Sequence, residues 1–163
     1  MSADRPKIRA VFDCMVFLQG AARRENAAGA CLLLVELDAV ELCLSKEILA
    51  EVRDVFTRPR VRQKFPALAG GLVDRFLAAL EKRAVFTPEV PHVFFYERDP
   101  KDEPYLNLAI ATGASYLVSR DLDILDLANA GNPDGGRLRH HAPHLPILNP
   151  GSFLTEARLQ ALR

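Results

Sequence analysis

The sequence lacks an apolar run of the roughly 20 residues that a membrane-spanning helix needs. Its first ten residues, MSADRPKIRA, also lack the apolar segment of a secretory signal. We therefore expect a protein that does not enter a membrane and that stays in the cytoplasm.

Cysteine is scarce, with only Cys14, Cys31 and Cys43 among the 163 residues. An odd number argues against a disulfide framework, and the absence of a CxxC pair argues against a zinc site. Three widely spaced cysteines are instead typical of small buried side chains in a reducing compartment.

The chain also has no net charge, because 21 basic residues balance 21 acidic ones. This balance argues against strong nonspecific binding of nucleic acids, which usually requires a basic protein. The basic residues are nevertheless clustered in TRPRVRQK, residues 57–64, and in RLRHH, residues 137–141. A solvated surface is the commoner explanation for either cluster.

The chain does contain 49% hydrophobic residues, with no internal repeat and no long linker, so we expect one domain over residues 1–163. Short apolar runs predict strands at 8–13, 41–45, 84–87, 116–119 and 146–149. Helical spacing and capping residues predict helices at 27–37, 46–58, 66–84, from 102 or 103 to 113, 123–129 and 151–162. Gly, Pro and Asn predict a loop at 131–144. Strands that alternate with helices indicate an α/β fold, with a parallel central sheet flanked by helices.

Acidic side chains follow the predicted strands at the edge where parallel sheets bind ligands. Asp13 ends the first predicted strand, Asp121 comes two residues after the fourth, and Asp102 lies at a helix N-terminus. Glu51 can join them, because it borders the apolar stripe of its helix. We therefore expect these four side chains to converge on one cleft.

Each acid also has a structural explanation. Asp102 could be only a helix cap, Asp13 could cap whatever follows its strand, and Glu51 could be a surface residue. Asp121 and Asp123 could be turn residues. The convergence of four acids weakens these explanations, and carboxylates without soft ligands suit Mg²⁺ or Mn²⁺.

The same residues lie in stretches that resemble a known family. The stretches are VFDCMVFLQG (11–20), LSKEILAEVRDVFTRPRV (44–61), RDPKDEPYLNLAIATGASYLVSRDLDIL (98–125) and PILNPGSFL (146–154). In this order they resemble the PIN-domain ribonucleases, in particular the bacterial VapC-like toxin components of toxin–antitoxin systems. The resemblance implies a parallel sheet flanked by helices and metal-dependent hydrolysis of RNA.

Carried over by position, the resemblance also implies the residues of the site. The catalytic acids would be Asp13, Glu51, Asp102 and Asp121, and the metal ligands would be Asp13, Asp102, Asp121 and Asp123. Ser119 matches the small hydroxyl residue that commonly precedes the last acid. The cofactor would be Mg²⁺ or Mn²⁺, which would neutralise the scissile phosphate and activate water. Glu51 would complete the coordination or accept the proton of that water.

The resemblance extends to partners. Arg58, Arg60 and Arg62 are candidates to bind the phosphates that flank the scissile bond of an RNA substrate. Family membership implies a cognate antitoxin protein and frequent homodimers. His140 and His144 are four residues apart, as in helical zinc sites, but the predicted loop around them argues against a metal there.

The sequence departs from the family pattern directly after Asp13, where Cys14 and Met15 replace polar residues. The lost polar groups would have oriented the first acid or a water molecule, and such losses can cost ~10–100-fold in affinity or activity. The segment at 131–144 is also longer than the compact family pattern. An alternative function is therefore a catalytically weak or inactive PIN-like module that binds RNA or protein.

Overall fold

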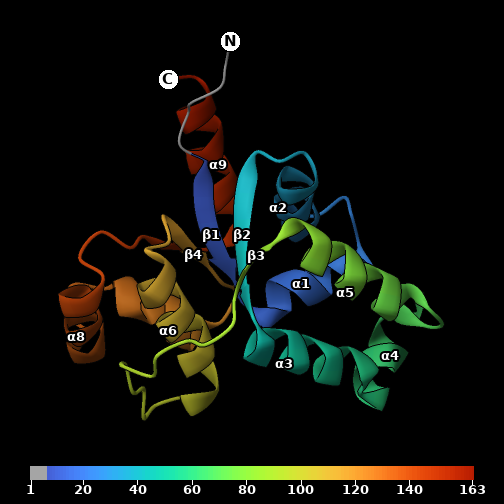
Figure 1. The fold of residues 1–163 in the computed structure, drawn as a ribbon, viewed down its shortest axis with the longest axis horizontal. Helices are drawn as coiled ribbons and strands as arrows, with labels where there is room; N and C mark the ends of the chain where they lie inside the picture. Colours follow the sequence, from blue (N-terminus) through green and yellow to red (C-terminus); the bar gives the residue numbers. More distant parts are fainter. Residues whose placement is uncertain (1–6) are drawn as a thin grey trace.

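The computed structural model describes residues 7–163 and contains a five-stranded sheet (Figure 1). Its strands are β1 (Ile8–Phe12), β2 (Val40–Ser45), β3 (Val85–Thr87), β4 (Tyr116–Val118) and β5 (Ile147–Leu148). They are ordered β3-β2-β1-β4-β5, and every neighbouring pair is parallel. The predicted single-domain α/β fold with a parallel central sheet is therefore confirmed.

Helices connect and flank the strands. They are α1 (Cys14–Ala22), α2 (Ala27–Glu36), α3 (Lys46–Thr57), α4 (Pro59–Lys64), α5 (Leu72–Arg83), α6 (Glu103–Thr112), α7 (Leu122–Leu125), α8 (Pro133–His141) and α9 (Pro150–Ala161), with 3₁₀ turns at Pro66–Leu68, Pro100–Asp102 and Asp126–Ala128. In Figure 1, α1, α3 and α5 lie to one side of β1 and β2, and α6 and α8 lie to the other. Within the described residues, no helix is long and apolar enough to cross a membrane.

The central strand and the helix after β2 show how the sequence builds the core. Ala10, Val11 and Phe12 of β1 have no exposed surface, as expected for a strand covered on both faces. The helix α3 begins where the Ser45 hydroxyl accepts a hydrogen bond from the Ile48 N–H at 3.2 Å. It buries Ile48, Val52 and Phe56 on one face, which leaves the intervening polar residues at the boundary or in solvent.

Residues 131–144 do not form the predicted loop, because most of this segment is the helix α8. Asn132 caps the helix, with its side-chain oxygen accepting from the Gly135 N–H at 3.0 Å. A β-carbon at Gly135 would collide with the carbonyl oxygen of Leu127. The Asn, Pro and Gly residues that predicted a loop therefore supply a cap, a first-turn proline and a close packing contact.

Other helices also differ from the prediction. α1 begins directly after Asp13 and α4 begins at Pro59, in two stretches for which no helix was predicted. The helix expected at 66–84 begins only at Leu72, since Gly70 adopts a left-handed conformation with φ of 71°. All three cysteines are free and buried, as the sequence indicated.

Candidate active site

The sheet reverses its strand order beside β1, and in open α/β sheets ligands bind at such a point. From β1 the chain adds β2 and β3 on one side, and it then adds β4 and β5 on the other. Asp13 follows β1, and its N–H donates to the carbonyl oxygen of Val118, at the end of β4, over 3.0 Å. Ser119 and Asp121 follow β4, so the two strand ends bring their polar residues together.

A cleft of about 380 Å³ opens at this point and is lined by all four predicted catalytic acids. Its lining comprises the acids Asp13, Glu51, Asp99, Asp102 and Asp121, the basic residues Arg58, Arg60, Lys64 and Lys101, and a largely apolar remainder that includes Met15, Leu18, Val55, Val61 and Phe65. A single cleft therefore offers carboxylates, cationic side chains and an apolar surface.

Asp13 is held in place by hydrogen bonds from three groups. It is buried, and its Oδ1 accepts from the Val16 N–H at 3.0 Å. Its Oδ2 accepts from the Arg120 N–H at 3.2 Å and from the Ser119 hydroxyl. Burial raises the pKa of the Asp13 carboxyl, and the three hydrogen bonds oppose that rise. Asp13 therefore caps α1, as its structural explanation required, and also lines the cleft.

Ser119 links two of the acids. Its side chain is fully buried, its hydroxyl donates to Asp13, and the same oxygen accepts from the Asp121 N–H at 2.9 Å. The small hydroxyl residue predicted before the last acid therefore lies between the ends of β1 and β4.

Asp102 is the least compensated of the acids. It is 6% exposed, and its Oδ2 has no hydrogen-bond partner within the described residues. It stands at the N-cap position of α6 but makes no capping hydrogen bond, so the helix-cap explanation does not hold. Burial raises the pKa of its carboxyl to about 8, and the nearby charges of Asp121 and Asp99 add to this effect.

Four aspartates lie close enough to share one metal ion. One oxygen from each of Asp99, Asp102, Asp121 and Asp123 lies within 4.8 Å of all the others. Asp102, Asp121 and Asp123 were predicted as metal ligands, and the fourth predicted ligand, Asp13, lies outside this group. Asp99 was not predicted. The available signal was Pro100, which begins a 3₁₀ turn at Pro100–Asp102, because residues three apart lie on the same side of such a turn. An all-carboxylate group fits a hard divalent cation.

Asp121 and Asp123 also have local roles. The Asp121 side chain accepts a hydrogen bond from the Asp123 N–H at 2.8 Å and caps α7. Arg98 pairs with Asp123 at 2.9 Å and with Asp126 at 2.7 Å. The predicted turn role is therefore real, and Arg98 offsets part of the negative charge of the cluster.

Glu51 lies on the opposite wall of the cleft from α6. Its Oε2 accepts a hydrogen bond from the Tyr105 hydroxyl at 2.9 Å. Burial raises the pKa of its carboxyl, and the Tyr105 hydrogen bond works against that rise. Glu51 therefore lies in the cleft but outside the group of four aspartates that could hold a metal ion.

The predicted basic residues do not all reach the cleft. Arg58 and Arg60 line it, whereas Arg62 does not. Arg58 is engaged by Asp54 through hydrogen bonds of 3.2 and 2.7 Å. Lys101 also lines the cleft, although it was not among the predicted phosphate-binding residues.

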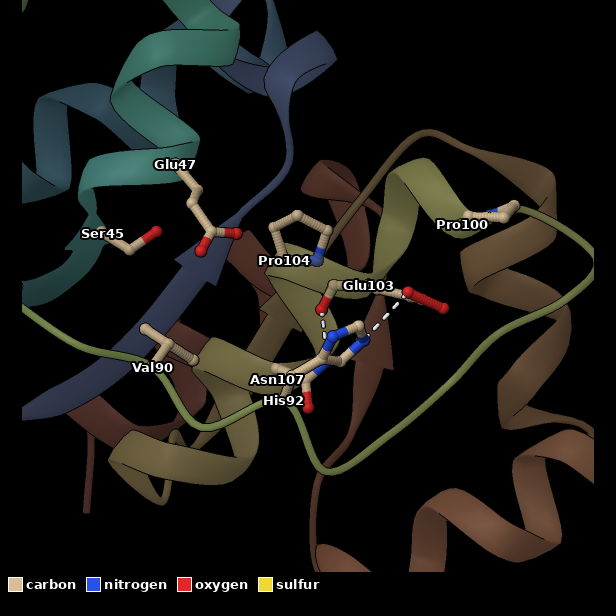
Figure 2. A pocket seen from close by; sticks show the side chains of 8 residues that line it. All are labelled: Ser45, Glu47, Val90, His92, Pro100, Glu103, Pro104 and Asn107. Carbon is tan, nitrogen blue, oxygen red and sulfur yellow. Dashed lines mark hydrogen bonds and ion pairs between the residues drawn. The ribbon is translucent and has the colours of Figure 1, made fainter.

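Side chains in and around a smaller pocket of about 250 Å³ anchor the segment before Asp99 to α6. Figure 2 shows His92 reaching Glu103, whose Oε1 lies 2.9 Å from the imidazole Nε2. The other Glu103 oxygen accepts from the Tyr96 N–H at 2.7 Å. The Asn107 side-chain oxygen accepts from the N–H groups of Val93 and Phe94, at 2.8 and 2.9 Å. These bonds fix the chain that leads into the acidic cluster.

The C-terminal histidines form no metal group within the described part of the chain. His140 lies in the last turn of α8 and His144 lies beyond it, so the two do not share a helix face. Among residues 7–163, the aspartate cluster is the group with metal-binding geometry.

Comparison with known proteins identifies the family of this arrangement. The family model of the PIN domain matches residues 9–123, which include β1 from its second residue, β2 to β4 and every acid of the cleft. A search of curated proteins found no match. PIN domains are generally metal-dependent nucleases, and the acidic cluster fits that activity. Because the match covers more than half of its length, the chain belongs to the PIN domain family.

Proposed function

We propose that this protein is a metal-dependent endoribonuclease that hydrolyses single-stranded RNA and acts as the toxin of a toxin–antitoxin pair. The observation that carries the nuclease proposal is the buried Asp102 carboxylate, whose Oδ2 has no hydrogen-bond partner among residues 7–163 although three other carboxylates lie close to it. Such a group costs free energy unless a cation compensates it. The toxin role rests on the resemblance to VapC-like sequences.

The residues present fit a divalent cation. The donor set consists of carboxylate oxygens alone, which Mg²⁺ and Mn²⁺ prefer. Asp99, Asp102, Asp121 and Asp123 would hold the ion, with Asp13 beside them at the end of β1. When bound, a divalent ion supplies charge neutralisation at the scissile phosphate and a bound water of lowered pKa.

The other residues of the cleft would orient and activate the reactants. Glu51 would accept a proton from the attacking water while the oxygen of that water bonds to phosphorus. The bond from phosphorus to the leaving ribose oxygen breaks, and that oxygen takes a proton from solvent. Asp13, fixed by Ser119, would keep the edge of the cluster rigid. This division of roles suits Glu51, which lies in the cleft but outside the aspartate group.

The cationic and apolar walls favour single-stranded RNA. Arg60 and Lys101 line the cleft and can contact phosphates. Met15 and Phe65 line the same cleft, and apolar or aromatic side chains bind bases that have left a stacked duplex. A duplex keeps its bases stacked inside, so it could not use this surface.

A binding module without catalysis is the second candidate. The observation that favours it is the pair Cys14 and Met15, which line the cleft where the family pattern has polar residues. Burial raises the pKa of the Cys14 thiol to about 12, so this side chain remains neutral. On this alternative the cleft would bind RNA or protein without cleaving it.

The test is cleavage of end-labelled single-stranded RNA by the purified protein with Mg²⁺, Mn²⁺ or EDTA. We expect cleavage with metal, none with EDTA and none with Asp102→Asn. Cleavage that persists unchanged in Asp102→Asn would place the activity elsewhere. Stable RNA with the folded, metal-loaded wild type would favour the binding module. If RNA is cleaved, coexpression with a candidate antitoxin protein would test the toxin role.

A further inference from the structure

We propose that Tyr105 is a positioning residue, which holds the Glu51 carboxylate in the cleft through its hydroxyl group. The inference rests on the proposed function, since it concerns how the general base is oriented. Tyr105 was not among the predicted site residues.

The contact joins two walls of the cleft. Tyr105 lies in the first turn of α6, three residues after Asp102, and is 2% exposed. Its hydroxyl donates to Oε2 of Glu51, on α3, over 2.9 Å. Both side chains line the cleft. One hydrogen bond therefore connects the helix that follows Asp102 to the helix that carries Glu51.

The bond is well suited to orientation. Burial raises the pKa of the Tyr105 phenol further above its usual value, so the group remains a donor at any working pH. A glutamate side chain has several rotatable bonds, and an unanchored carboxylate would populate several rotamers. Within residues 7–163, no other hydrogen bond to the Glu51 carboxylate is present. The position of Glu51 therefore depends on this one hydroxyl.

The cationic side chains of Arg58 and Lys101 lie near enough to lower the pKa of Glu51, but Tyr105 is the group that hydrogen-bonds to it. Cys14 borders both Tyr105 and Glu51, but its buried thiol is a weak donor. Asp13, on the same side, is an acceptor already bonded to Ser119 and to two backbone N–H groups.

A purely structural role is the competing explanation, because a buried tyrosine needs an acceptor for its hydroxyl. The two explanations differ in what Tyr105→Phe should change. This variant keeps the ring and its packing. A structural role predicts a lower melting temperature with normal turnover by the folded protein. A positioning role predicts slower turnover in the folded protein.

The matched control is Tyr116→Phe. Tyr116 is also buried, and its hydroxyl accepts a hydrogen bond from Gln160 at 2.7 Å. It does not line the cleft. Both variants therefore lose one partly buried hydrogen bond of a buried tyrosine, but only Tyr105 contacts Glu51.

The experiment measures kcat and KM for a labelled RNA with Mn²⁺, below the melting temperature of every variant. We expect Tyr105→Phe to lower kcat ~10–100-fold, the usual effect of removing an orienting partner, with KM unchanged. Tyr116→Phe should leave both constants unchanged. In a Glu51→Ala background, Tyr105→Phe should cause no further loss, because the group that it positions is absent. Wild-type kcat in Tyr105→Phe, or an equal loss in both backgrounds, would overturn the inference and leave the ribonuclease proposal standing.

A wild type that cleaves no RNA would remove the ribonuclease proposal, and the contact is then judged without activity. Thermal melting in EDTA would be compared for Tyr105→Phe, Glu51→Gln and the double variant. Shifts that are clearly non-additive support the anchoring of Glu51 by Tyr105. Additive shifts show that the two side chains are independent, and they overturn the inference.

Discussion

The metal-free protein should become more stable at neutral pH when Asp102 is replaced by asparagine. In the folded chain the pKa of this buried carboxyl rises from 3.8 to about 8. Between these two values folding takes up a proton, so the free energy of unfolding falls as pH rises. At pH 7, about three units above the unfolded pKa, the buried carboxyl lowers the free energy of unfolding by ~4 kcal/mol, because each pH unit contributes about 1.36 kcal/mol.

Asparagine removes this penalty but leaves a polar amide in a buried place. An unpaired buried polar group costs about 1–3 kcal/mol. The expected net gain of Asp102→Asn at pH 7 is therefore about 1–3 kcal/mol. Each kcal/mol shifts the melting temperature of a chain of this size by about 2–4 °C, so the variant should melt about 2–12 °C higher. The gain should vanish or reverse toward pH 4, because this pH is close to the ordinary pKa of 3.8 and the charge penalty of the folded wild type has then largely disappeared.

The assay is thermal unfolding in EDTA from pH 4 to pH 8, with Asp74→Asn as the control. Asp74 is an exposed carboxylate paired with Arg53 at 2.8 Å, and its removal should change little. Mn²⁺ at ~100 times its dissociation constant should stabilise the wild type by about 2.7 kcal/mol and stabilise Asp102→Asn much less. A variant that melts below the wild type by the same amount at every pH would refute the reasoning. Asp102 would then be a structural residue.

The sheet and the place of the acids could be predicted because they depend on local sequence. A strand buried on both faces is apolar along its whole length, as Ala10, Val11 and Phe12 are. Asp13 follows this strand directly, so its location at the carboxyl edge follows from the parallel order. The start of α3 is equally local, since Ser45 caps it with its own side chain.

The helix α8 could not be predicted because its residue types are common both in loops and at the start of helices. Asn, Pro and Gly are common in loops, but the same three residues form a helix cap, a first turn and a close contact. Whether the segment forms a loop or a helix depends on its packing against the carbonyl oxygen of Leu127, which lies close to Gly135 and belongs to another segment.

The composition of the cluster depends on tertiary structure in the same way. Asp99 reaches it because a 3₁₀ turn begins at Pro100, and because bonds from Glu103 and Asn107 anchor the preceding segment. Tyr105 and Glu51 are 54 residues apart. No pattern within a single helix would pair them.

The departure from the family pattern after Asp13 has a smaller effect on the first acid than expected. The replacement of polar residues by Cys14 and Met15 suggested that the first acid or a water molecule would lose its orientation. In the structure Asp13 keeps three hydrogen bonds, from Val16, Ser119 and Arg120. Two of these donors are backbone N–H groups, which exist whatever side chain follows Asp13.

Three further predictions test the roles of individual side chains in and beside the cleft. Arg60→Ala should weaken binding of a short RNA and reduce the slope of the logarithm of the binding constant against the logarithm of the salt concentration by about one. Arg62→Ala, outside the cleft, should change neither. Ser119→Ala should lower the melting temperature by about 2–12 °C, because the buried Asp13 loses a hydrogen bond worth about 1–3 kcal/mol. Phe65→Ala should weaken binding of single-stranded RNA by about 1–3 kcal/mol, the loss expected for a base-stacking side chain. It should not affect an abasic strand of equal length, since that strand keeps the phosphates and lacks the bases. In fluorescence anisotropy, an equal loss for both strands would mean that Phe65 shapes the cleft and contacts no base.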